Sequence, residues 1–184
     1  MRMLLIFKNS IKLIITQKSS WCKQSILGML LFLNVTSTYA ATEQSISRVV
    51  ASVERRYNIP RNLLLSIAKV ESDVSPFAIN IEGKPILAKS KEEAINIVQS
   101  YLDKGVTNID IGLLQINWRF HGENFDDVSE LLDINKNLDY AASFLKKLYK
   151  THGSWQKAVQ YYHSARPKHY RKYSRKIITT WING

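Results

Sequence analysis

One glutamate is a candidate for chemistry because it ends an apolar stripe on a predicted helix. The stripe lies in the segment from Asn58 to Asn80, and its members at helical spacing are Leu64, Ile67, Ala68 and Glu71. Burying an ionised carboxylate beside apolar side chains is costly, so we expect the pKa of Glu71 to be raised. A carboxyl with a raised pKa can act as a general acid near neutral pH. A lone glutamate at a helix end more often faces solvent, so the catalytic interpretation depends on other motifs.

Helices are expected to supply most of the framework that positions Glu71. Pro60 suits the first turn of its helix, because a missing N–H has no partner to lose there. Ser90 and Glu93 form a capping box for another helix, which ends at Gly105. Further helices are predicted over residues 42–57, 128–132, 135–149, 154–162 and from 167 onward. The last of these carries an inward stripe of Tyr170, Tyr173, Ile177 and Trp181.

Little β structure is expected. Residues 76–87 look extended but lack strand periodicity, and residues 106–120 match no regular element throughout. The pattern therefore predicts a mainly α fold of six or seven helices with little or no β.

The 184 residues suit one domain preceded by an export signal. Residues 1–23 hold five basic and no acidic residues, residues 26–35 form an apolar run, and residues 38–40 resemble a signal-peptidase site. We expect a signal peptide over residues 1–40 and the folded domain over 41–184. The protein would then be exported, or held at the membrane if its N-terminal segment is retained.

The charge and composition of residues 41–184 limit the classes of partner and cofactor that the protein could bind. Without residues 1–40, 21 basic and 15 acidic residues leave a net charge of +6, which suits an anionic partner. The only cysteine, Cys22, lies in the expected signal, and the histidines lack metal-ligand spacing, so neither a metal nor another cofactor is expected. Residues 166–176 are basic and aromatic, but their helical spacing turns the cations outward. This favours a solvated basic face over nucleic-acid binding.

Three segments in a fixed order carry the strongest functional signal: VES at 70–72, GLLQIN at 112–117 and AVQYYHSA at 158–165. Together they resemble the catalytic domain of lytic transglycosylases of the soluble-lytic-transglycosylase type, which has a goose-lysozyme-like helical fold. The resemblance covers most of residues 43–165. It implies that Glu71 is the catalytic acid/base. The substrate-binding residues that it implies are Ser72, Gln115, Asn117, Tyr161 and Tyr162, with the Tyr162 hydroxyl near the catalytic carboxyl.

The chain departs from the family pattern at three positions. Leu114 replaces the commoner methionine, a mild change. His163 and Ala165 stand where the family usually has asparagine and glycine. Alanine would be costly there if the backbone required a positive φ, so the local turn geometry is where a difference is expected.

Asp110 is the second carboxylate to consider, because it lies two residues before Gly112 in a D-x-G-L-x-Q-I-N pattern. It could act as an auxiliary base and permit some hydrolysis. The favoured interpretation is a turn aspartate that accepts hydrogen bonds from nearby backbone N–H groups. Asp110 is then dispensable for the reaction.

The resemblance implies a peptidoglycan lytic transglycosylase that cleaves the MurNAc–GlcNAc β-1,4 bond and forms a 1,6-anhydro product, acting as a periplasmic monomer. The D-x-G-L-x-Q-I-N pattern and residues 83–105 resemble members that serve type IV secretion and conjugation systems, whose components would be partners. Two alternatives keep the fold: a hydrolytic muramidase and a non-catalytic peptidoglycan-binding scaffold. A cationic nucleic-acid binder is a third alternative, which depends on charge alone.

Overall fold

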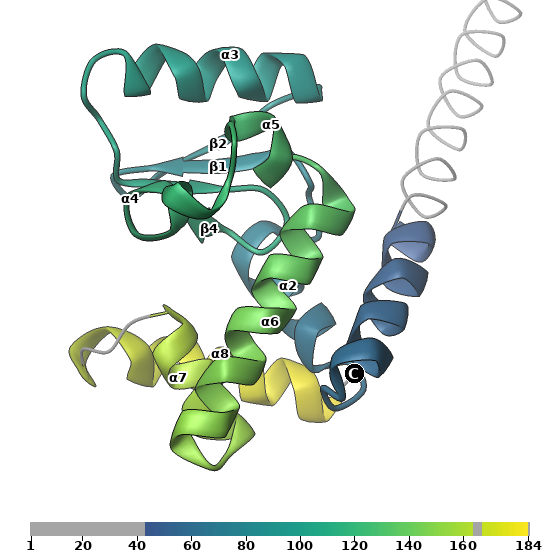
Figure 1. Cartoon of the computed structure of the whole chain (residues 1–184). Coiled ribbons are helices and arrows are strands. Elements are labelled where there is room, and N and C mark those ends of the chain that lie inside the picture. Colours follow the sequence, from purple (N-terminus) through teal and green to yellow (C-terminus); the bar gives the residue numbers. More distant parts are fainter. Residues whose placement is uncertain (1–42, 164–166, 184) are drawn as a thin grey trace, which may run out of the picture. The chain divides into compact units, whose positions relative to one another are not determined.

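The structure of the protein is a computed structural model that describes residues 43–163 and 167–183. The expected signal peptide, residues 1–40, lies outside the described residues. Residues 46–184 form one compact unit. This unit is mainly helical, which confirms the predicted fold class (Figure 1). No helix within the described ranges has both the length and the apolar character needed to cross a membrane.

The helices lie close to their predicted positions. Residues 43–57 are helical, and the longer helices after them are α2 (Leu63–Ser72), α3 (Lys91–Leu102), α6 (Ile134–His152), α7 (Trp155–His163) and α8 (Pro167–Asn183). Three short turns, α4 (Trp118–His121), η1 (Gly122–Asn124) and α5 (Val128–Leu131), connect the sheet to α6. The capping box of α3 is confirmed, since Ser90 Oγ accepts the Glu93 N–H at 3.2 Å. The Glu93 carboxylate reaches back to the Lys89 N–H at 2.7 Å.

The small amount of β structure takes the form of one antiparallel sheet in the order β2-β1-β3-β4. Its strands are β1 (Ala78–Ile81), β2 (Lys84–Leu87), β3 (Ile109–Ile111) and β4 (Ile116–Asn117). The last two lie within the stretch that was expected to be irregular. Strands of two to four residues are too short to show a period, and β2 is mostly exposed. Sequence periodicity therefore could not reveal them.

Helix α2 begins at Leu63, three residues later than Pro60 suggested. The difference has a physical cause in Glu54, a buried residue of the preceding helix. Its carboxylate accepts backbone N–H groups from Asn62 at 2.9 Å, Leu64 at 2.8 Å and Leu65 at 3.3 Å. These N–H groups have no partner within the helix, so a carboxylate from another helix takes the place of a local cap.

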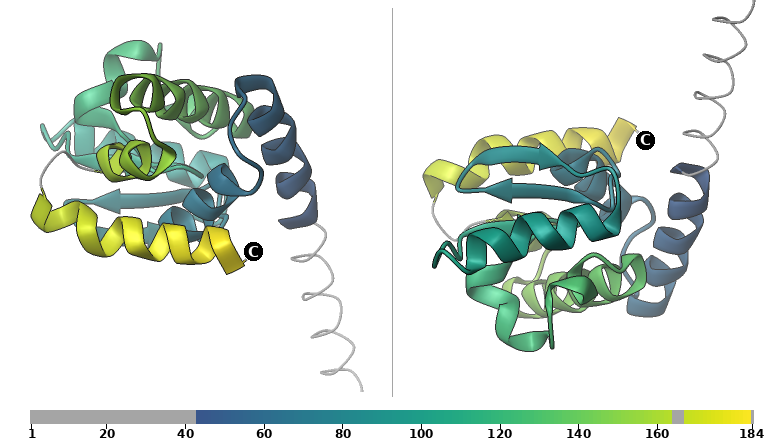
Figure 2. Two further views of the ribbon diagram at one scale, coloured as in Figure 1. Left: turned by 90° about the horizontal axis from the view of Figure 1, so that it is seen from below. Right: turned by 90° about the horizontal axis from the view of Figure 1, so that it is seen from above.

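The apolar core surrounds α2 and extends to the sheet. Leu64, Ile67 and Ala68 are fully buried, so the predicted stripe before Glu71 is confirmed. In the views of Figures 1 and 2, α3 runs beside the sheet, whereas α2, α6, α7 and α8 gather on the other side of the unit. Helix α8 packs against both α2 and α7. The end of α2 contacts the 112–115 turn, because the Ser72 hydroxyl bonds the Leu113 carbonyl oxygen, and α2 also packs against α8.

Candidate active site

Glu71 lies in the last turn of α2 and is partly buried. Burial is the largest influence and raises its pKa from 4.5 to about 7. A hydrogen bond from Tyr173 and the positive charge of Lys176 oppose that rise, whereas the negative charge of Asp110 adds to it. Near neutral pH a carboxyl with this pKa is present in both its protonated and its ionised form. It can therefore both give and accept a proton near neutral pH.

Tyr173 of α8 makes the direct contact with Glu71, and its hydroxyl donates a hydrogen bond to Glu71 Oε1. Burial raises the pKa of the Tyr173 phenol well above its ordinary value, so the phenol stays protonated and remains a donor. The sequence placed Tyr173 on an inward helical stripe but gave it no role at the site. The contact joins residues 102 positions apart in the chain, which local periodicity does not reveal.

Ser72 attaches the end of α2 to the 112–115 turn. Its hydroxyl donates to the Leu113 carbonyl oxygen at 2.7 Å and also lies 3.1 Å from the Ala68 carbonyl oxygen. This serine therefore fixes the backbone next to Glu71 through a protein contact.

Gly112 allows the 112–115 turn to approach α6 closely. Its φ is +79°, and a Cβ at this position would lie 2.4 Å from the Leu131 carbonyl oxygen and 2.6 Å from Asn137 Nδ2. Gln115, at the other end of the turn, also has a positive φ of 47°. Both the backbone conformation and the close approach thus require glycine at 112.

Asn137 of α6 holds this turn in place and was missed by the sequence reasoning. Its Oδ1 accepts the Leu114 N–H at 2.9 Å, while its Nδ2 donates to the carbonyl oxygens of Leu131 at 2.8 Å and Ile111 at 3.2 Å. The residue is buried beside Leu138, on the inward side of a strongly amphipathic helix. A polar residue at such a core position was the available signal, because a buried amide needs partners.

Tyr162 of α7 contacts the same turn, since its hydroxyl donates to the Leu114 carbonyl oxygen at 2.9 Å. Its phenol is close enough to Glu71 for that charge to raise its pKa, although burial has the larger effect. The Tyr162 phenol is thus within electrostatic range of the Glu71 carboxyl. Its hydrogen bond goes to the turn, whereas Tyr173 bonds the carboxyl.

The amide side chains named as sugar contacts bond to the protein itself. Gln115 Nε2 donates to the carbonyl oxygens of Ala78 at 3.0 Å and Gly112 at 2.9 Å. Asn117 Nδ2 donates to Asp110 at 2.8 Å and to Asn108 at 3.0 Å. These contacts fix the orientation of both amides beside the 112–115 turn.

Tyr161 lies in a different environment from its neighbour Tyr162. Its ring stacks on His152 with the ring centroids 3.8 Å apart and the planes 9° apart. His152 is the last residue of α6 and Tyr161 lies in the last turn of α7, so this contact ties the C-terminal ends of the two helices together.

Asp110 lies on strand β3, paired with Asn117 of β4, and not in a turn. Burial raises the pKa of its carboxyl, and the hydrogen bond from Asn117 opposes the rise. Its charge in turn raises the pKa of Glu71, which links the two carboxyls electrostatically. The described residues contain no group of three or more histidine, cysteine or acidic side chains able to hold a metal.

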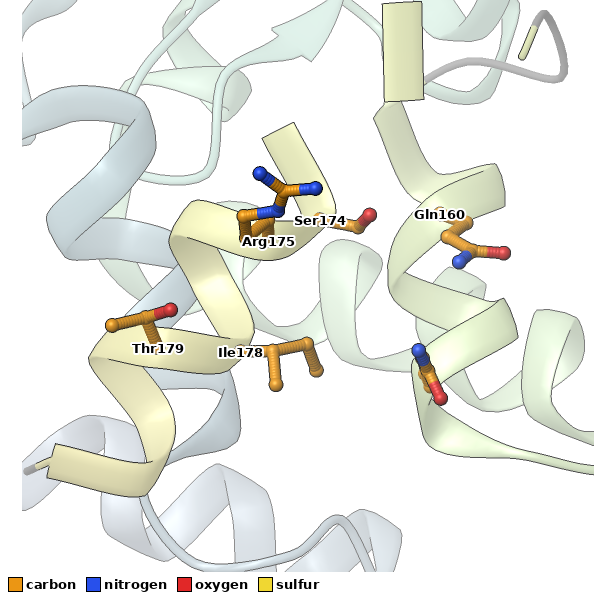
Figure 3. A pocket seen from close by; sticks show the side chains of 6 residues that line it. Gln160, Ser174, Arg175, Ile178 and Thr179 are labelled. Carbon is orange, nitrogen blue, oxygen red and sulfur yellow. The ribbon is translucent and has the colours of Figure 1, made fainter. Parts of the chain in front are cut away.

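A separate cavity of about 300 Å³ lies between α7 and α8 (Figure 3). Its lining residues are mostly polar and come from these two helices: Gln156, Gln160, Ser174, Arg175, Ile178 and Thr179. Glu71 does not line it, and it contains no carboxylate. The cavity therefore offers none of the acid/base chemistry expected of Glu71.

A helical unit that holds one protonatable glutamate at a helix end, beside a small antiparallel sheet, has the architecture of a lysozyme-like domain. The family model of the transglycosylase SLT domain matches residues 48–177. The chain therefore belongs to this family and is, in general terms, a peptidoglycan lytic transglycosylase. No curated protein and no solved structure matches it.

Proposed function

We propose that this enzyme cleaves the MurNAc–GlcNAc β-1,4 bond of peptidoglycan with Glu71 as its only acid/base, and that the product ends in 1,6-anhydroMurNAc. The observation that supports this most directly is the environment of Glu71. Its pKa of about 7 lets one carboxyl donate a proton and then take one back near neutral pH. Glycosidases that transfer the sugar to water generally divide these tasks between two carboxyls.

The proposed reaction has two steps that balance without water. The Glu71 carboxyl first gives its proton to the glycosidic oxygen, the bond from that oxygen to C1 of MurNAc breaks, and GlcNAc leaves with a free 4-hydroxyl. The acetamido oxygen of MurNAc stabilises the electron-poor C1. The Glu71 carboxylate then takes the proton of the MurNAc C6 hydroxyl while O6 bonds to C1, which closes the anhydro ring and restores the acid.

Tyr173 suits both steps as an orienting residue. Its hydroxyl donates to Oε1 of Glu71, which favours the carboxylate and so lowers its pKa. The other oxygen of Glu71 can then carry the proton that is transferred. A positioned carboxyl loses less entropy on the way to the transition state than a freely rotating one.

Hydrolysis to a reducing end is the alternative that a specific observation favours. The charge of Asp110 reaches Glu71, so a second carboxylate stands near the reacting group. A water molecule activated by Asp110 could then replace the C6 hydroxyl as the nucleophile. A scaffold that binds peptidoglycan without turnover is the remaining alternative, and it predicts no product of either kind.

We also propose that the protein is exported to the periplasm and opens the wall locally for a secretion or conjugation apparatus. The support is the signal-like pattern of residues 1–40 and the D-x-G-L-x-Q-I-N pattern around Asp110. Deleting the gene should impair assembly of that apparatus, and a complementing Glu71→Gln copy should fail to restore it. Normal assembly in the deletion strain would contradict this proposal.

Mass spectrometry of muropeptides tests the reaction. Purified wild-type protein and its Glu71→Gln variant are incubated with peptidoglycan sacculi. Anhydro ends from the wild type and none from the variant are expected. Reducing ends that disappear in the variant would establish the hydrolytic alternative, and products of equal amount from both would exclude Glu71 as the acid/base.

A further inference from the structure

The residue that ends α7 stacks on the tyrosine that bonds Glu71. The rings of His163 and Tyr173 have centroids 4.0 Å apart and planes 15° apart. His163 is exposed, so its ring is not placed there by the need to fill the core. We infer that His163 is a positioning residue that acts on Glu71 through Tyr173. The expected effect of His163 on turnover rests on the proposed function, whereas its effect on the Tyr173–Glu71 contact does not.

The stack restricts the side-chain rotation that would move the Tyr173 hydroxyl off Glu71. The hydroxyl lies at the far end of the ring, so a small rotation about the Cα–Cβ bond moves it away from the Glu71 oxygen. A ring held flat against a second ring resists that rotation, and stacked aromatic pairs stabilise each other beyond the area that they bury. The hydroxyl then remains on Glu71 Oε1.

Two successive side chains at the end of α7, Tyr162 and His163, each contact a part of the structure next to Glu71. Tyr162 donates to the Leu114 carbonyl oxygen and holds the 112–115 turn. His163 lies against Tyr173 of α8. Helix α8 also packs on α2, which carries Glu71. An asparagine at position 163 would have no ring to stack on Tyr173.

Loss of the stack should have a defined electrostatic effect. The hydrogen bond from Tyr173 lowers the pKa of Glu71. If the Tyr173 hydroxyl bonds Glu71 for a smaller fraction of the time, it lowers the pKa of Glu71 by less. That pKa should therefore rise above its wild-type value of about 7. The carboxylate that forms when Glu71 donates its proton would then be less stabilised. The first proton transfer should therefore slow, and turnover should fall without a matching change in KM.

The test compares His163→Ala, His163→Phe, Tyr173→Phe and the double variant His163→Ala/Tyr173→Phe in the purified protein. We expect kcat to fall about threefold to tenfold in His163→Ala, with KM little changed. In His163→Phe, which keeps a stacking ring, we expect kcat to stay within about twofold of the wild type. The double variant should be no slower than Tyr173→Phe alone, because the proposed effect of His163 on Glu71 passes through that hydroxyl.

A second measurement does not need turnover. NMR titration of the Glu71 side-chain carboxyl should give a higher pKa in His163→Ala and in Tyr173→Phe than in the wild type. His152→Ala is the matched control, because it removes a stack of similar geometry, His152 on Tyr161, and should leave the pKa of Glu71 unchanged.

The outcomes separate the two proposals. A wild-type protein that forms no product contradicts the proposed function, and the titration then still decides the role of His163. An unchanged Glu71 pKa in His163→Ala overturns the inference, as does a His163→Ala effect that persists in full beside Tyr173→Phe. A His163→Phe variant as slow as His163→Ala would point to a direct contact of the imidazole with substrate, and would also overturn it.

Discussion

Replacing Glu71 by glutamine should stabilise the folded protein at alkaline pH. In the wild type, the pKa of this carboxyl rises from 4.5 to about 7 on folding, mainly through burial. Between these two pH values the folded state binds more protons than the unfolded state, so the free energy of unfolding falls as the pH rises. The pKa shift corresponds to about 3 kcal/mol of unfolding free energy. The wild type loses this stability in full above pH 7 and loses none of it below pH 4.5. Glutamine has no proton to lose, so the variant escapes this loss.

Urea unfolding of wild type and Glu71→Gln at pH 4 and pH 8 measures the effect. The difference in unfolding free energy between the two proteins should move by about 3 kcal/mol in favour of the variant between the two pH values. Glu82→Gln, an exposed change in the turn between β1 and β2, is the control and should alter stability by about 0.5 kcal/mol or less at either pH. A difference for Glu71→Gln that does not depend on pH would refute the claim that burial raises its pKa.

Three further changes test other parts of the site. Asn137→Ala leaves three buried backbone groups without their partner. In urea unfolding it should reduce the free energy of unfolding by about 3 kcal/mol or more. Asn135→Ala, an exposed change on the same helix, is the control and should alter that free energy by about 0.5 kcal/mol or less. Gly112→Ala should lower stability by at least about 2 kcal/mol in the same assay, since φ is +79° and the added Cβ would meet a carbonyl oxygen at 2.4 Å. Asp110→Asn removes a charge that raises the pKa of Glu71, so the alkaline limb of the pH–kcat/KM profile should shift to lower pH. Complete loss of product in Asp110→Asn would instead support the hydrolytic alternative.

The part of the site that could be predicted from sequence is the part governed by short-range spacing. Helical periodicity placed Leu64, Ile67 and Ala68 in the core and Glu71 at the end of the helix, and the structure agrees. The capping box at Ser90 was predictable for the same reason, because its partners are three residues apart.

The contacts that tune Glu71 could not be predicted in this way. Glu54 caps α2 from another helix, Asn137 reaches a turn 23 residues away, and Tyr173 bonds a residue 102 positions earlier. Each depends on how helices pack, which the 3.6-residue period does not determine. A polar residue on the inward side of a helix marks such a contact, but the sequence does not reveal its partner.

The 112–115 turn explains why a change of side chain at its centre is tolerated. Leu114 contributes its backbone to the site, because its N–H bonds Asn137 and its carbonyl oxygen accepts the Tyr162 hydroxyl. The neighbouring Leu113 carbonyl oxygen accepts a hydrogen bond from the hydroxyl of Ser72, the residue that follows Glu71. Both leucine side chains are buried in the core, where leucine and methionine fill similar volumes. Leucine in place of the family's methionine therefore leaves the hydrogen bonds that hold Glu71 in position, whereas a residue other than glycine at 112 would displace the backbone that makes them.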